Sequence, residues 1–327
     1  MSLRMLHRIA ICGLVSMTMP FASRLMAQNL TLEGQTGGFL TPTAYVVYTE
    51  KDHFFSHPAV GYHFIDANKV IGDVHTFSIE EGFANRAEVG YTRSVHWTGD
   101  STSFSSLWHY AGMNIINGKV VAIKDGQFGP WTPGFAVGGL VRTSDKFVSG
   151  ALGQEFAALA GINAPAKAYT NGDVYVSATK TWLHPPLPFL VNFGWKATNA
   201  SIYGLGGQAT RFGGRLFGGL GIPLPGPFKT AIVPSAGFSQ EPPTSVNLGA
   251  ILLGGRAHLP TTLDYAVRVT QKDHPHFAFD IGVGQVAGMI GTTQVATGLP
   301  APYPPVVLVP VNLDARHVVG VGLSIRP

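Results

Sequence analysis

The chain has 327 residues, of which 45% are hydrophobic and only 12% charged, with 41 Gly, 23 Pro and a formal net charge of +4. An apolar content this high excludes an intrinsically disordered chain, and the lack of a glycine repeat excludes collagen. Frequent Gly and Pro disfavour long helices, and the apolar content exceeds what a soluble core of this size uses, which points to strands in contact with lipid.

The first 27 residues are predicted to be a cleaved secretory signal peptide. Arg4 and Arg8 precede an uncharged apolar run over 9–21, and Ala27 places a small residue at the cleavage position. An anchoring helix is the less favoured alternative, because the run is shorter than the roughly 20 residues that span a bilayer.

Removal of this signal changes the charge and the cysteine content. It lowers the count of Lys and Arg from 22 to 19, against 18 Asp and Glu, and it takes away Cys12, the only cysteine. The remaining domain, 28–327, therefore has no disulfide, thiol nucleophile or cysteine-ligated metal. Its near neutrality gives no indication of nucleic-acid binding.

Beyond the signal, the chain alternates apolar with polar residues. Tyr265 and Val267 fall on one face of a predicted strand, and Asp264 and Arg268 on the other. Because no uncharged apolar run beyond the signal reaches 18 residues, spanning helices are not predicted. The pattern predicts an all-β fold, a transmembrane antiparallel β-barrel, with a soluble β-sandwich as the alternative.

Turn signals divide the domain into sixteen candidate strands, of which two or four are expected to merge or fail, so that we expect about 12–16 strands with 14–16 favoured. The candidates are 43–49, 57–65, 69–79, 83–95, 106–116, 119–124, 134–143, 173–182, 188–196, 201–209, 213–221, 229–239, 246–254, 262–272, 277–285 and 317–325.

The connections suggest which end of the barrel faces which side. Short turns are expected in the periplasm at 66–68, 184–187, 240–245 and 273–276, opposite the two long loops 144–172 and 286–316. Ser144 begins a predicted short helix over 144–162, which either plugs the lumen or lies over the rim. The proline-rich second loop is expected to be a stiff surface arm.

These features together resemble the Gram-negative outer-membrane β-barrel proteins over the whole of 28–327. The resemblance implies a location in the outer membrane, outer-membrane lipids as surroundings, and insertion by the barrel insertion machinery. Gly37 to Ala44, with the sequence GGFLTPTA, also resembles the Gly-Leu-x-Thr-Pro-Thr-Ala opening of exopolysaccharide-associated barrel proteins. The ending Ile325-Arg326-Pro327 departs from the terminal aromatic residue that such barrels usually carry.

No catalytic motif is recognised. His109 with Ser105, and His75 with Ser78, are chance-level pairs that lack a third orienting group. The residues 273–276, Asp-His-Pro-His, are predicted to be a solvated turn and not a metal site. We therefore predict no enzyme, metal or cofactor, with a Ser/His barrel enzyme as a remote alternative.

The functional candidates are polar residues predicted to face the lumen: Arg86, Glu88, Arg142, Asn192, Lys196, Asp264, Arg268, Lys272 and Asp280. Buried charges require partners or water. Either water fills the lumen, giving a channel for small polar solutes, which is the favoured function, or the charges pair across the lumen and close it. The second case corresponds to a structural barrel or one associated with polysaccharide export.

Overall fold

The structure is a computed structural model that describes residues 29–66, 73–97, 112–145, 168, 170–182, 187–200, 203, 208–242, 261–271, 277–287, 289–296, 306–312 and 316–326. The signal segment, the 246–254 strand, the 273–276 turn and residues 146–162 of the predicted helix lie outside these residues. Ser144, the predicted first residue of that helix, is instead the last residue of a strand, Gly134–Ser144.

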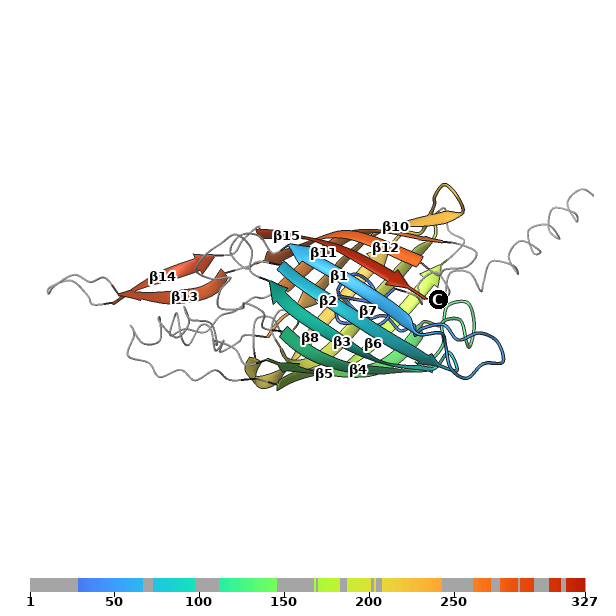
Figure 1. Ribbon diagram of the computed structural model, residues 1–327, viewed down its shortest axis with the longest axis horizontal. Helices are drawn as coiled ribbons and strands as arrows, with labels where there is room; N and C mark the ends of the chain where they lie inside the picture. The colour runs from blue at the N-terminus through green and yellow to red at the C-terminus, as the bar shows by residue number, and fades with distance from the viewer. Residues whose placement is uncertain are drawn as a thin grey trace, which may run out of the picture.

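Twelve antiparallel strands close into a barrel, which Figure 1 shows from the side. The ring is closed because β1 pairs with both β2 and β15, and β10 pairs with both β8 and β11. The strands are β1 (Ala59–Asp66), β2 (Asp73–Phe83), β3 (Ala87–Trp97), β4 (Gly112–Ile123), β5 (Gly134–Ser144), β6 (Thr170–Trp182), β7 (Phe189–Ala200), β8 (Gln208–Gly221), β10 (Thr230–Gln240), β11 (Thr261–Gln271), β12 (Phe277–Ala287) and β15 (Arg316–Ile325).

Three further strands lie outside this ring. The two-residue β9 (Leu224–Pro225) pairs with β10, and β13 (Met289–Ala296) with β14 (Val306–Asn312) forms a separate hairpin beyond one end of the barrel (Figure 1). The predicted all-β antiparallel barrel is confirmed. Its twelve strands are the lower limit of the expected range, so the favoured count of 14–16 was too high.

Two of the extra predicted strands are explained by the structure. The segments 106–116 and 119–124 contribute to one strand, β4, because the pairing with β3 continues through Asn117 and Gly118 without a turn. The segment 43–49 is not a strand: it lies inside the barrel, where side chains of the wall satisfy its backbone. Most of the predicted strand 201–209 lies outside the described residues, and its last two residues belong to β8, which begins at Gln208.

The loss of the 43–49 strand changes which connections share an end. One end, the short-turn end, has the connections 84–86, 124–133, 183–188, 222–229 and 272–276 and the end of β15; the opposite long-loop end has 145–169, 241–260 and 288–315. The long loops are therefore together as expected. The connections at 66–68 and 240–245, however, are at the long-loop end and not at the end that has 184–187 and 273–276. Neighbouring strands run in opposite directions, so each predicted strand that is absent from the ring moves the next connection to the other end.

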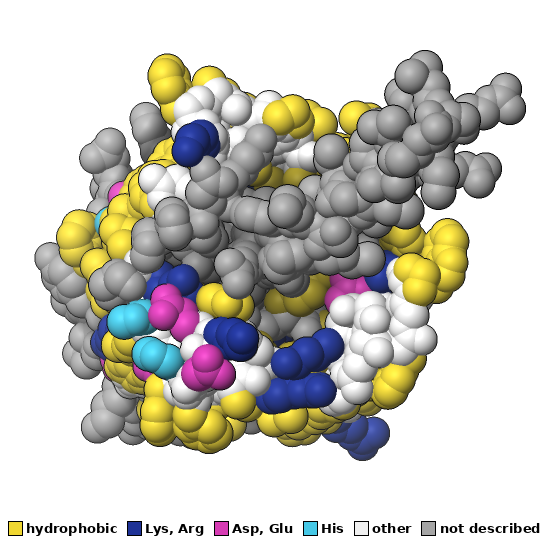
Figure 2. Space-filling view, turned by 90° about the vertical axis from the view of Figure 1, so that its right-hand side faces the viewer, with side chains coloured by type: hydrophobic (Ala, Val, Ile, Leu, Met, Phe, Trp, Pro, Cys, Tyr) yellow, Lys and Arg dark blue, Asp and Glu magenta, His cyan; other side chains and the backbone are white. Residues whose placement is uncertain are grey.

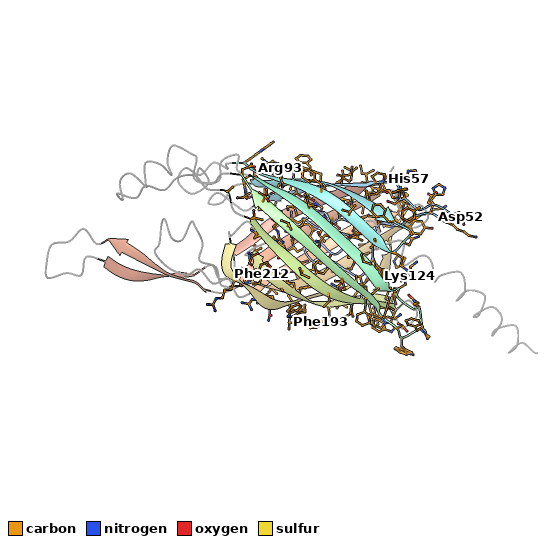
Figure 3. The ribbon with its side chains drawn as sticks, turned by 90° about the horizontal axis from the view of Figure 1, so that it is seen from below. Asp52, His57, Arg93, Lys124, Phe193 and Phe212 are labelled. Carbon is orange, nitrogen blue, oxygen red and sulfur yellow. The ribbon has the colours of Figure 1, made fainter. Side chains whose placement is uncertain are left out.

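The outer face of the wall is apolar, and its side chains alternate with buried polar ones. Val267 is 40% exposed whereas Arg268, its neighbour, is 5% exposed. Phe193 projects outward from the wall in Figure 3, while Asp52 and Arg93 lie at opposite ends. A closed barrel with an apolar outer belt satisfies its backbone within lipid, so the fold is that of a transmembrane barrel of the outer-membrane type. Among the residues described, no helix is long and apolar enough to cross a membrane.

Candidate functional site

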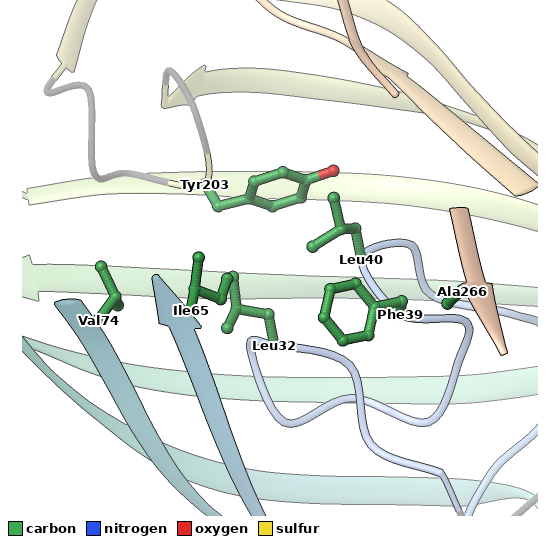
Figure 4. Packing of buried hydrophobic residues seen from close by; sticks show 7 residues of the cluster. All are labelled: Leu32, Phe39, Leu40, Ile65, Val74, Tyr203 and Ala266. Atoms are coloured by element: carbon green, nitrogen blue, oxygen red, sulfur yellow. The ribbon is translucent and has the colours of Figure 1, made fainter. Parts of the chain in front are cut away.

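The lumen is occupied by residues 29–49, named here the inner segment. Leu30 and Val47 have no exposed surface, and most of the segment is buried. It folds back on itself, since the amide of Leu32 donates to the carbonyl of Phe39 (3.1 Å) and that of Gly37 to Asn29 (2.9 Å). Its loops run between the barrel strands in Figure 4. The segment joins β1 at the short-turn end, so it enters the lumen from that side.

A buried ion pair on β3 and β4 holds the middle of the inner segment. The Nζ atom of Lys119 lies 2.8 Å from Oε1 of Glu88, and both side chains have no exposed surface. The Glu88 carboxylate accepts from the amides of Thr36 and Val47, each at 3.0 Å, and Lys119 donates to the carbonyl of Thr36 at 2.9 Å. Two distant parts of the segment are thus attached to one wall pair.

A second cluster joins the inner segment to β5 and β6. The guanidinium of Arg142 donates to both oxygens of Glu33, from Nε at 2.5 Å and from Nη2 at 2.9 Å. Its Nη2 also donates to Asp173 at 2.8 Å. Burial raises the pKa of the Glu33 carboxyl, and the charge of Arg142 opposes that increase. Arg142 therefore bridges one carboxylate of the wall and one of the segment.

A third cluster lies across the lumen on β11 and β12. Arg268 donates to both oxygens of Asp280, at 2.7 and 3.1 Å, and to the carbonyl of Gly37 at 3.2 Å. The side-chain amide of Asn29 also faces this guanidinium. Nearer the short-turn end, Arg326 donates to the carbonyl of Tyr48 at 2.9 Å. The inner segment is consequently fixed on several sides of the barrel.

Apolar packing completes these attachments. Figure 4 shows a cluster in which Leu32, Phe39 and Leu40 of the inner segment meet other buried apolar side chains. These are Ile65, Val74 and Ala266 of the wall and Tyr203 of the connection between β7 and β8. Glycines of the wall leave room for it. A Cβ atom on Gly320 would lie 2.7 Å from the ring of Phe39, and one on Gly82 would lie 2.3 Å from the carbonyl oxygen of Val47. Gly82 and Gly320 therefore border the inner segment, and a side chain at either position would collide with it.

The structure places most of the predicted lumen residues on the inner face. Glu88, Arg142, Arg268 and Asp280 form the clusters above, and the remaining three are buried as well. Asn192 donates to the carbonyl of Pro42, Lys196 pairs with Glu241 at 3.5 Å, and Asp264 is 4% exposed.

Two predicted residues are not part of this set. Arg86 lies in the turn between β2 and β3 and donates to the carbonyls of Val121 and Ala122, so it is at the rim and not on the lumen wall. β3 begins at Ala87, so Arg86 is the last residue of the preceding turn and belongs to no strand. Lys272 lies outside the described residues.

Sequence reasoning missed Glu33, Lys119 and Asp173. In the sequence analysis, β4 was divided into two strands, 106–116 and 119–124, so Lys119 fell at the start of a short strand and was not assigned to the lumen face. The alternation through the undivided β4 puts it on the same face as Asn117. Glu33 belongs to a part of the chain with no strand or helix period, so no sequence signal indicated it.

The one proposed Ser/His pair within the described residues does not form. Ser78 faces the lumen, where its hydroxyl accepts from Thr92 at 2.8 Å. His75, three residues away, is on the outer face, where its Nδ1 atom lies 2.7 Å from the hydroxyl of Tyr62. Residues an odd number of positions apart on a strand point to opposite faces. His75 and Ser78 therefore cannot act together.

Little free space remains beside the inner segment. A cavity of about 20 Å³, enough for about one water, is bordered by Glu33 and Gln35 of the segment and by Tyr175, Lys196 and Phe217 of the wall. Figure 2 looks onto the short-turn end, where charged and histidine side chains gather at the rim inside a hydrophobic outer surface. Among the described residues, the inner segment therefore fills much of the lumen.

Comparison with known proteins gives structural neighbours only. No family model and no curated protein match the chain. The KdgM porin has a TM-score of 0.43 at 10% identity over 82% of this chain and 98% of its own, and the NanC porin 0.42 at 9% over 83% and 100%. Omp33 of Acinetobacter baumannii has 0.36 at 8% over 83% and 98%. At this identity and TM-score the likeness identifies no family.

Proposed function

We propose that the protein is an outer-membrane channel for small polar solutes, and that the inner segment closes it. The observation that supports this proposal is the pairing of charges within the wall. Lys119 pairs with Glu88, and Arg268 with Asp280, and in both pairs the partners lie on neighbouring strands. These two pairs do not depend on the inner segment, so without it the wall would keep them and remain polar, and a water-filled channel has a polar lining.

The width of the lumen supports the same function. Eight-stranded barrels are filled by their own side chains. Here twelve strands enclose a whole folded-back stretch of polypeptide, 29–49, in addition to the wall side chains. A cross-section that holds such a segment will pass a small solute when the segment is displaced.

A closed structural barrel is the second candidate, and the filled lumen favours it. The resemblance of Gly37–Ala44 to exopolysaccharide-associated barrels suggests polysaccharide export as its setting, because these residues lie in the inner segment. The two candidates differ in one property. A channel requires the inner segment to move, whereas a structural barrel does not.

A reversible disulfide distinguishes them. A Cβ atom on Gly134 of β5 would lie 3.6 Å from the Cβ atom of Ala44, within the range for a disulfide. The double variant Ala44→Cys/Gly134→Cys is expected to give conductance steps in planar bilayers when reduced, none when oxidised, and steps again after dithiothreitol. Ala44→Cys alone is the control and should not respond to oxidation. Silence of the wild type and of the reduced variant would reject the channel and leave the structural barrel.

A further inference from the structure

We propose that the lumen wall contains a recognition site for a carboxylate-bearing polar solute, and that Glu33 occupies this site while the barrel is closed. The inference rests on the proposed function, since a solute reaches the wall only when the inner segment is displaced. It names the class of solute that the open lumen would bind most strongly.

The geometry of Arg142 is that of a carboxylate receptor. Two nitrogens on one edge of its guanidinium donate to the two oxygens of Glu33, at 2.5 and 2.9 Å. A planar guanidinium fits a planar carboxylate in this two-point arrangement, and the hydrogen bonds are stronger than those of neutral partners. Glu33 is the member of this pair that belongs to the inner segment, so its departure leaves the Nε edge open to another carboxylate.

The wall holds this guanidinium in position without Glu33. Nη2 of Arg142 donates to Asp173 at 2.8 Å, and Nη1 donates to Oδ1 of Asn171 at 3.3 Å. Both partners are on β6, next to the strand of Arg142, and both are buried. The receptor is therefore preorganised, and binding does not require Arg142 to be ordered again.

The surroundings suit a polar solute larger than the carboxylate alone. The rings of Tyr175 and Phe217 form an edge-on pair beside the small cavity, and Lys196 borders the same cavity. The Tyr175 hydroxyl and Oδ1 of Asp173 are buried and have no hydrogen-bond partner. These unpartnered atoms can bond hydroxyl groups of a solute that replaces the inner segment.

The charges of the site favour a singly charged ligand. Arg142 already forms an ion pair with Asp173, and Lys196 with Glu241. Glu33 adds one further carboxylate, which the site accommodates. A single carboxylate reproduces this arrangement, a neutral solute leaves the Nε edge of Arg142 unpartnered, and a doubly charged phosphate adds excess negative charge in a buried place.

Chemical rescue in the full chain tests the site without requiring an open channel. Glu33→Ala removes the carboxylate and leaves its receptor on the wall. Acetate is expected to raise the thermal unfolding midpoint of Glu33→Ala in a saturable manner, and acetamide, a neutral molecule of the same shape, is expected not to. The wild type should respond to neither. An equal response to acetate and acetamide, or none to acetate, would overturn the proposal.

A second variant assigns the effect to Arg142. Glu33→Ala/Arg142→Lys keeps the positive charge and so protects folding, but it lacks the two-point fork, and it should lose most of the acetate response. An unchanged response would overturn the assignment. In the reduced disulfide variant, gluconate should block the current at concentrations where its neutral analogue sorbitol does not. Rescue by acetate with silent bilayers would sustain the site and reject the channel, whereas conductance without rescue would do the reverse.

Discussion

Single residues of the wall act as members of buried pairs, and this changes what substitutions do. The alternation alone suggests that Arg268 faces a lumen where its loss is tolerated. The structure corrects this expectation. Arg268 and Asp280 form a two-point ion pair in which their side chains are 6% and 2% exposed. Arg268 also donates a hydrogen bond to the carbonyl of Gly37. Removal of one partner leaves an uncompensated buried charge, which costs more than the pair contributes.

We therefore expect Arg268→Met to lower the free energy of unfolding by about 3–5 kcal/mol. The double variant Arg268→Met/Asp280→Leu should recover most of this loss, because no lone charge remains. Arg93→Met is the control: its pair with Asp145 is about one-third exposed, so the cost should be about 0–1 kcal/mol. Urea unfolding in lipid vesicles measures all three. Equal costs for Arg268→Met and Arg93→Met would contradict the buried pair.

The neighbouring residue tests the outer face. Val267 is 40% exposed on the lipid side of β11. Val267→Arg should cost about 2–4 kcal/mol if the position lies at the middle of the bilayer, because a charge is then placed in hydrocarbon. Val267→Leu, which keeps the apolar contact, should be close to neutral in the same vesicle assay. Full tolerance of the arginine would mean that this face is in water.

At the scale of elements, the inner segment and the wall fit through specific small residues. Gly82 near the end of β2 faces the lumen, and Val47 crosses it so closely that a methyl group would meet its carbonyl oxygen at 2.3 Å. A backbone oxygen held by neighbouring bonds cannot move as a flexible side chain can. The next turn is tied to the same part of the segment, since Asn85 donates to the carbonyl of Thr49 and accepts from its amide, both at 2.7 Å.

Gly82→Ala is accordingly expected to cost roughly 1–3 kcal/mol by overpacking and to loosen the inner segment. Increased cleavage within 29–49 by a protease added to the detergent-solubilised protein would show the loosening. Gly118→Ala is the matched control on β4, where the nearest atom to the new methyl group is 3.6 Å away. If both variants are cleaved at the same rate, the close approach at Gly82 does not position the segment.

The whole molecule has two unlike ends, and this asymmetry predicts its orientation. Barrels of the outer membrane keep short turns in the periplasm and long loops outside the cell. Phe128 is 73% exposed in the 124–133 connection of the short-turn end, whereas Asp66 is exposed at the opposite end. The inner segment would then close the lumen from the periplasmic side.

Cysteine labelling in intact cells tests that orientation. The sequence has no cysteine apart from Cys12, so single introduced thiols give a clear signal. An impermeant maleimide should label Asp66→Cys in intact cells and Phe128→Cys only after the outer membrane is opened. The reverse pattern would place the long loops in the periplasm and contradict the assignment of the two ends.

The sequence alone determined the architecture and the two faces of most strands. Strands such as β11 and β12 were recognised because a period of two is a local property: side chains at i and i+2 share a face whatever the strand pairs with. For the same reason the inward positions of Glu88, Arg142 and Asp280 were predictable. Arg86 was misplaced because a turn interrupts the period at that residue.

Only the tertiary structure decided how many strands close the ring and what fills it. The residues 43–49 resemble a strand in composition, yet their amides bond to Thr179 and Glu88, which the barrel brings to them from other strands. The pairing of Glu33 with Arg142 likewise joins positions far apart in the chain. Such contacts depend on the closed geometry of the wall and leave no periodic pattern in the sequence, because the two residues in contact are far apart in the chain and neither one's chain neighbours indicate the other.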